Sequence, residues 1–106
     1  MTVVYRLSSR RYPANSGKGA GLYGGRWNSV GIEVIYTAQS PSLAALEILV
    51  HYDVLPTDFV LTTIQIPDEV EVRVLKRLPA NWDQEVPVPA TRSVGDRWVR
   101  GSQRRY

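Results

Sequence analysis

The sequence contains no cysteine, one histidine and no long uninterrupted apolar run. Without cysteine, the chain forms no disulfide and offers no thiolate for catalysis. Because His51 is the only histidine, a tetrahedral zinc site would lack nitrogen and sulfur ligands, and we expect no metal. The longest apolar run, residues 43–50, is broken by Glu47 and is far shorter than the ~20 residues that cross a bilayer. No charged-then-apolar leader opens the chain. These features predict a soluble cytoplasmic protein without a membrane partner.

The composition is that of one globular domain with a modest basic excess. A chain of 106 residues with 43% hydrophobic residues is long enough for a single core. The net charge of +3 is compatible with nucleic acid and equally with an anionic small molecule such as a dinucleotide. Arginines gather in the last 15 residues, and a solvated basic terminus explains them as well as a binding surface does.

Four segments have the pattern of β-strands. Residues 3–7 and 59–66 alternate between two faces, as strands do. Residues 70–74 alternate valine with charged residues, which predicts a half-exposed antiparallel strand. Residues 34–37 predict a short buried strand.

Two segments predict helices. Ser40 suits the N-cap and Pro41 the first position of a helix over residues 41–50, which is apolar almost all round and is therefore expected to be buried on most sides. Thr91 is expected to cap a final short helix that carries Trp98. The order strand, loop, strand, helix, strand, strand, helix predicts an α+β fold.

The chain ends at Tyr106, where a mixed sheet would usually add another strand. We therefore expect residues 1–106 to form one domain that is incomplete at its C-terminus. Unpaired edge strands promote association between chains, so a homo-oligomer is one expected outcome.

Glu47 is the most informative candidate residue. An ionised carboxylate within an apolar helix is costly unless it has a partner or a function. His51 lies one turn later on the same helical face. The alternatives are that Glu47 lies at a surface edge of the helix or pairs with a structural arginine.

A glycine-rich segment, residues 16–31, provides the second candidate. It holds six of the eight glycines, and such a segment allows the backbone to approach a ligand closely or forms a flexible surface loop. Within it, Arg26 follows Gly25 and has a planar fork suited to phosphate. Trp27 either stacks on a base or, as we favour, anchors the loop. Its Gly-x-Gly-x-x-Gly spacing is a weak dinucleotide signal, because no βαβ unit is visible.

Two further residues are candidates for binding. Arg6, on the first predicted strand, is a second cation. Tyr36 lies shortly before the helix that carries Glu47 and either presents its ring to a ligand or lies in the core.

Three blocks in order, residues 24–31, 34–38 and 43–51, strongly resemble the RES domain of bacterial toxin–antitoxin systems. Residues 5–7, 78–82 and 95–98 fit the same pattern, so the resemblance covers nearly the whole chain. The family is named for an arginine, a glutamate and a serine, and Arg26 and Glu47 match the first two. The family serine lies in a C-terminal Val-Pro-Ser motif that this sequence lacks. Ser102 does not have that context and is not assigned the role.

The resemblance implies an ADP-ribosyltransferase-like fold, with mixed or antiparallel sheets and a few short helices, and an enzyme that degrades NAD. It also implies an Xre-like antitoxin as partner, which binds the DNA, so that this chain itself does not. On this interpretation Glu47 stabilises positive charge on the ribose, Arg26 and Arg6 hold the pyrophosphate, Tyr36 packs against the nicotinamide or its ribose, and Gly25 and Trp27 help to bind the dinucleotide. Two alternatives stay open. The absent serine motif allows an inactive remnant that binds antitoxin, and the basic charge, the aromatic residues and the strand-rich pattern allow a basic nucleic-acid-binding module.

Overall fold

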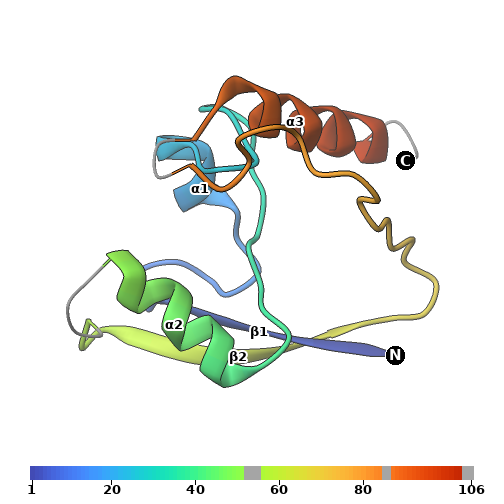
Figure 1. Cartoon of the computed structure of the whole chain (residues 1–106). Coiled ribbons are helices and arrows are strands. Elements are labelled where there is room, and N and C mark those ends of the chain that lie inside the picture. The colour runs from blue at the N-terminus through green and yellow to red at the C-terminus, as the bar shows by residue number, and fades with distance from the viewer. Residues whose placement is uncertain (52–55, 85–86, 104–106) are drawn as a thin grey trace. The chain divides into compact units, whose positions relative to one another are not determined.

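The computed structural model describes residues 1–51, 56–84 and 87–103. Its elements are β1 (Thr2–Ser9), α1 (Lys18–Tyr23), α2 (Pro41–His51), β2 (Phe59–Ile66) and α3 (Pro89–Gln103) (Figure 1). This small α+β structure, with a two-stranded antiparallel sheet, confirms the predicted fold class. Each helix in these ranges falls short of the length and apolarity that crossing a membrane requires.

The chain divides into two compact units, each built from two separate segments of sequence. Unit 1 contains Met1–Asn15 and Tyr36–Arg73, and unit 2 contains Ser16–Ile35 and Val74–Tyr106. Each unit is therefore described by itself.

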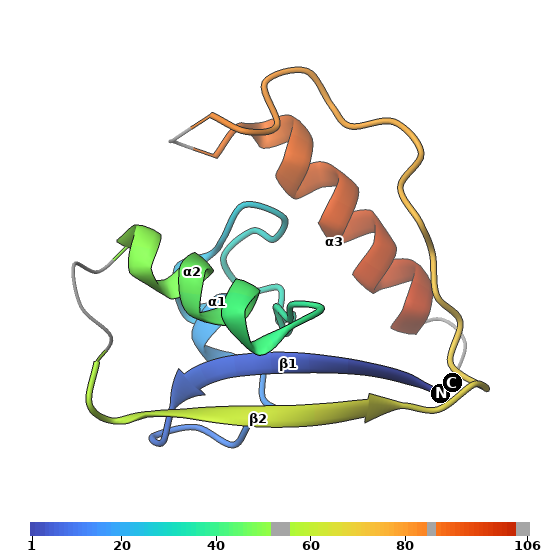
Figure 2. The same ribbon diagram turned by 60° about the horizontal axis from the view of Figure 1, so that its bottom comes forward.

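The centre of unit 1 is the β1–β2 sheet. The two strands pair along their full lengths, from Thr2 opposite Ile66 to Ser9 opposite Phe59 (Figure 2). Along β2, exposed residues alternate with partly buried ones, as the sequence pattern predicts. Val4 lies opposite Ile64, and because directly opposed residues share a face, their side chains lie on the more buried side of β2.

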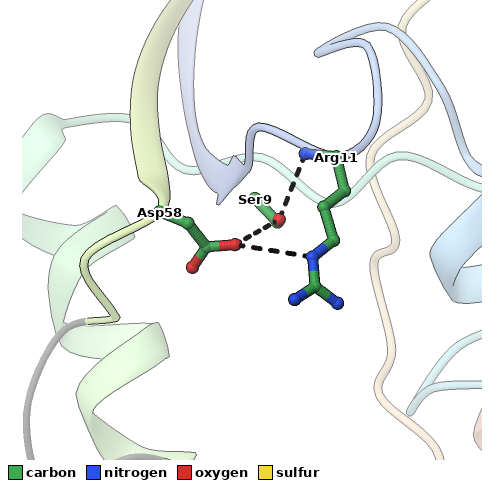
Figure 3. Close-up of polar contacts among 3 residues, drawn as sticks. All are labelled: Ser9, Arg11 and Asp58. Carbon is green, nitrogen blue, oxygen red and sulfur yellow. Dashed lines mark hydrogen bonds and ion pairs between the residues drawn. The ribbon is translucent and has the colours of Figure 1, made fainter.

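A polar cluster closes one end of this sheet (Figure 3). The Ser9 hydroxyl donates a hydrogen bond to Asp58 Oδ2 at 2.8 Å and accepts one from the Arg11 backbone N–H at 3.2 Å. The Arg10 backbone N–H donates to the Asp58 carbonyl at 2.9 Å. Arg11 Nε lies 4.0 Å from the same carboxylate oxygen of Asp58. The cluster therefore holds the chain where it leaves β1 against the residue that precedes β2.

Helix α2 packs against β1, and it begins as predicted. The Ser40 hydroxyl accepts a hydrogen bond from the Leu43 backbone N–H at 3.1 Å, an N-cap contact that typically contributes about 1 kcal/mol. The exposure of its side chains shows that the prediction of a helix buried on most sides is wrong. Among the described side chains of α2, Ala44 is buried, whereas Leu46 and Val50 are exposed, because β1 packs against one side of the helix.

Two predicted strands are absent from the described residues. Residues 34–37 form no regular strand; the Tyr5 and Ala38 backbones exchange two hydrogen bonds of 2.8 Å just beyond them. Residues 70–74 are exposed and irregular. An alternating pattern specifies which side chains share a face, but a strand also needs a neighbouring strand to bond its backbone.

Unit 2 contains the glycine-rich segment, the stretch that leads to α3, and α3 itself. The segment expected to be a loop contains the short helix α1, which ends at Tyr23 and is followed by the C-cap residue Gly24, where φ is +72°. Helix α3 is longer than predicted and begins at Pro89, so Thr91 lies inside its first turn rather than at the cap. The fully buried side chains in the described ranges are polar, Asn28 and Thr91, and hydrogen bonds therefore organise this unit.

Candidate functional site

The candidate arginine lies in a tight turn, which we call the arginine turn and define as residues Gly25–Ser29. Its base is closed by a hydrogen bond of 3.0 Å from the Gly25 backbone N–H to the Asn28 carbonyl. The buried Asn28 side chain donates to the Ala20 and Ile32 carbonyls, both at 2.8 Å. Asn28 thus fixes the turn between α1 and the segment that follows.

One face of α3 also packs against the arginine turn, in addition to the contacts that Asn28 makes. Its residues Thr91, Arg92, Gly95 and Asp96, which we call the α3 seat, are spaced i, i+1, i+4 and i+5 and therefore share a helical face. The Thr91 hydroxyl donates to the Arg26 carbonyl at 2.5 Å.

The remaining seat residues contact the turn on either side of that bond. Arg92 Nε donates to the Gly25 carbonyl at 2.9 Å. Asp96 accepts from the Ser29 backbone N–H at 2.9 Å and from the Ser29 hydroxyl at 2.5 Å. Position 95 requires glycine, because the Cβ of any other residue would lie 1.6 Å from the Trp27 carbonyl oxygen.

Asp96 is the buried charged residue of the α3 seat, with 7% of its surface exposed. The Ser29 hydroxyl and backbone N–H lower the pKa of its carboxyl group, burial opposes them, and Arg100 and Arg92 lower it further. The bonds to Ser29 therefore keep Asp96 ionised in a place where an unpartnered carboxylate would be costly.

The Arg26 side chain is oriented separately from its backbone. Its Nη1 donates a hydrogen bond of 2.7 Å to the Trp82 carbonyl. Trp82 lies in a turn with Asn81, whose φ is 61°. The Trp27 backbone rests on α3 at Gly95. The structure therefore brings Gly25, Arg26 and Trp27 together in one turn, while their roles in ligand binding stay predictions.

The other three predicted site residues belong to unit 1. Arg6 projects from β1, and its Nη1 donates to the Ala14 carbonyl at 2.6 Å. Burial lowers the pKa of the Arg6 guanidinium. Tyr36 is exposed and lies two residues before Ala38, which bonds to β1 at Tyr5. Arg6 and Tyr36 thus belong to neighbouring parts of the same unit.

Glu47 is an exposed residue of α2 and forms no ion pair with any other residue in the described ranges. Its position agrees with the surface-edge alternative and leaves the carboxylate accessible to a ligand. The predicted neighbour on its helical face, His51, has a side chain outside the described residues. In the part of the chain that the structure describes, no three acidic or histidine side chains cluster.

The α3 seat is the part of the site that sequence reasoning missed. The sequence places Thr91 at a helix cap, and Gly95 and Asp96 only in a block of the resemblance. One signal is present: a glycine in a helix interior costs about 1 kcal/mol, so Gly95 requires a packing reason. No sequence pattern identifies the arginine turn as the group that packs against the α3 seat, because the hydrogen bonds between them join residues 65–67 positions apart.

Comparison with known proteins matches residues 3–105 to the RES domain. The chain is 44% identical over 105 residues to a protein named Toxin Res from Photorhabdus laumondii, covering 94% of this chain and 67% of that protein. It is 42% identical over 113 residues to a Prs ADP-ribosylating toxin from Sphingobium sp., covering 97% and 70%. A Toxin Res from Yersinia enterocolitica is 42% identical over 103 residues, covering 92% and 67%.

Proposed function

The chain belongs to the RES domain family, and we propose that it acts as a toxin that breaks the bond between nicotinamide and ribose in NAD. Relatives of this chain are named toxins, and one is named for ADP-ribosylation. ADP-ribose is NAD without its nicotinamide, so an enzyme that transfers ADP-ribose from NAD must break this bond. The proposal includes an ADP-ribosyltransferase-like fold and NAD as substrate, with no metal.

The reaction needs a group that stabilises positive charge on the ribose. As the bond to C1′ breaks, its electron pair leaves with the nicotinamide nitrogen, and nicotinamide departs as a neutral molecule. The ribose then resembles the oxocarbenium ion of glycoside hydrolysis, which a nearby carboxylate stabilises. Glu47 is the carboxylate proposed for this role. An acceptor oxygen from water, phosphate or a protein side chain then bonds to C1′ and releases its proton.

Binding of the pyrophosphate is assigned to arginine. The observation that carries this part is the arginine turn, in which Arg26 is fixed by hydrogen bonds at its carbonyl and at Nη1. A guanidinium has five donors, so a phosphate can be bound through N–H groups other than the one directed at Trp82. Arg6 is the second proposed cation, Tyr36 the ring against nicotinamide or its ribose, and Gly25 and Trp27 the contacts beside Arg26.

The proposed partner is an antitoxin with an Xre-like helix-turn-helix domain. A toxin that depletes NAD harms its own cell unless it is inhibited, and an antitoxin that covers the active site would provide that inhibition. DNA binding is then the partner's property rather than that of this chain.

Glu47→Gln tests the catalytic assignment, because it removes the charge at nearly constant shape. We expect release of nicotinamide from NAD to fall on the order of 100-fold or more, with an unchanged melting temperature. The measurement is chromatographic detection of free nicotinamide. Glu69→Gln, at an exposed position outside the proposed site, is the matched control.

The same assay separates the rival functions. Parental activity in Glu47→Gln would exclude Glu47 as the catalytic carboxylate. If the parental chain released no nicotinamide, the enzyme proposal would fail, and a gel shift at two salt concentrations would then distinguish a nucleic-acid-binding module from an inactive antitoxin-binding remnant.

A further inference from the structure

Five contacts to four residues, Gly25, Arg26, Trp27 and Ser29, fix the arginine turn on both sides of Arg26, and all of them come from one helix. The α3 seat bonds to the carbonyls of Gly25 and Arg26, lies against the carbonyl of Trp27, and binds Ser29 through two hydrogen bonds. A turn that needed only to be closed would require no more than its internal bond from Gly25 to Asn28.

We propose that Thr91 and Asp96 are positioning residues, which hold Arg26 where its guanidinium binds the pyrophosphate of the dinucleotide. This inference rests on the proposed function and adds to it the residues through which the arginine acts. The seat fixes the backbone end of the Arg26 side chain, and the Trp82 carbonyl fixes Nη1 at the other end.

The chemistry of the seat suits this task. Bidentate recognition of a phosphate is directional, so a guanidinium that is displaced or free to move binds the pyrophosphate less tightly. Asp96 accepts two bonds from a single residue, Ser29, and is buried, so it restrains the turn without competing for Arg26 as an ion-pair partner would. Thr91 is fully buried and bonds to the carbonyl of the arginine itself.

The test is the kinetics of NAD cleavage by the full chain carrying Asp96→Asn or Thr91→Val, measured below the onset of thermal unfolding. A positioning role predicts a KM for NAD raised about three- to tenfold, with kcat per folded molecule within about twofold of the parental value. A merely structural role would lower the folded fraction and the melting temperature but leave KM unchanged. Thr91→Ser keeps the hydroxyl and should restore KM.

One control variant should leave KM unchanged, and a second should raise it. Ser93→Ala removes a hydroxyl from an exposed position of the same helix and should leave KM unchanged. Arg26→Lys keeps the charge but not the fork, and should raise KM about tenfold or more. If Asp96→Asn proves unfolded, Ser29→Ala removes one of the two bonds to Asp96 and tests the same contact more mildly.

The outcomes separate this inference from the proposed function. An unchanged KM in Asp96→Asn and Thr91→Val, with a raised KM in Arg26→Lys, would overturn the positioning role alone. Absence of NAD cleavage in the parental chain would overturn the proposed function and the positioning role together. Faster hydrogen exchange at the Ser29 backbone N–H in Asp96→Asn is the expected independent sign that the contact has been lost.

Discussion

At the scale of single residues, two carboxylates occupy opposite environments. Asp96 is buried and accepts two hydrogen bonds from Ser29, whereas Glu47 is exposed on α2. Bonding lowers the pKa of Asp96 and so commits it to the ionised form as a structural acceptor. Because Glu47 forms no ion pair with another described residue, its exposed carboxylate remains available for a ligand, as the role proposed for it requires.

The lowered pKa of Asp96 predicts a stability contribution that depends on pH. Because the folded-state pKa lies below the unfolded value of about 3.9, this contribution is fully present well above that value. It is lost as pH falls through the unfolded value toward the folded one. At pH 7, Asp96→Asn should therefore lower the melting temperature by about 5 °C or more, since a hydrogen bond to a charged group contributes about 1.5–3 kcal/mol.

Melting curves of parental and Asp96→Asn protein at a series of pH values check this. The difference between the two melting temperatures should shrink below about pH 4, where Asp96 becomes protonated first in the unfolded and then in the folded state. A difference that stays constant from pH 7 to about pH 3 would show that the charge on Asp96 does not stabilise the fold.

At the scale of elements, α3 contains two glycines in different surroundings. Gly95 faces the Trp27 carbonyl, while a Cβ added at Gly101 would lie in open space as far as the described residues extend. Alanine favours a helix over glycine by about 1 kcal/mol, so intrinsic propensity alone would stabilise both substitutions. Only the contact with the arginine turn separates their effects.

Gly95→Ala should therefore destabilise the protein, and Gly101→Ala should not. The added methyl group at residue 95 cannot occupy a position 1.6 Å from a carbonyl oxygen, so α3 and the turn must move apart. Overpacking of this kind costs about 1–3 kcal/mol, which predicts a melting temperature lower by about 5 °C or more. Thermal unfolding followed by circular dichroism measures both variants, and equal melting temperatures would contradict the close contact.

At the scale of the whole molecule, the two units are interleaved along the sequence. The chain leaves unit 1 after Asn15, returns at Tyr36 and enters unit 2 again at Val74. The last of these passages lies in an exposed, irregular stretch, residues 71–78. By contrast, the exposed Arg10 and Arg11 are held by backbone bonds to Asp58 and Ser9.

Limited proteolysis tests this difference. Trypsin should divide the chain first within residues 71–78, after Arg73, Lys76 or Arg77, because a protease needs an exposed backbone that can extend into its cleft. Mass spectrometry of the early fragments identifies the cut. Replacing Arg73, Lys76 and Arg77 together by glutamine should slow that cut, and a first cut after Arg10 or Arg11 would contradict the prediction.

The sequence by itself determined the local features of this protein. Alternation specified the faces of β2, and Ser40 specified the start of α2, because these depend on neighbouring residues alone. The absence of cysteine excluded thiolate chemistry, since composition alone decides it. The motif around Arg26 and Glu47 indicated the family, which the comparison confirmed.

Only the tertiary structure decided which groups meet. Thr91 and Asp96 contact residues 65–67 positions earlier, and such contacts depend on the path of the whole chain rather than on local preference. The same reason explains the absent strand at residues 70–74, whose alternation was present but whose backbone has no strand beside it within the described residues. A side-chain pattern is a property of a segment, whereas a hydrogen-bond partner is a property of the fold.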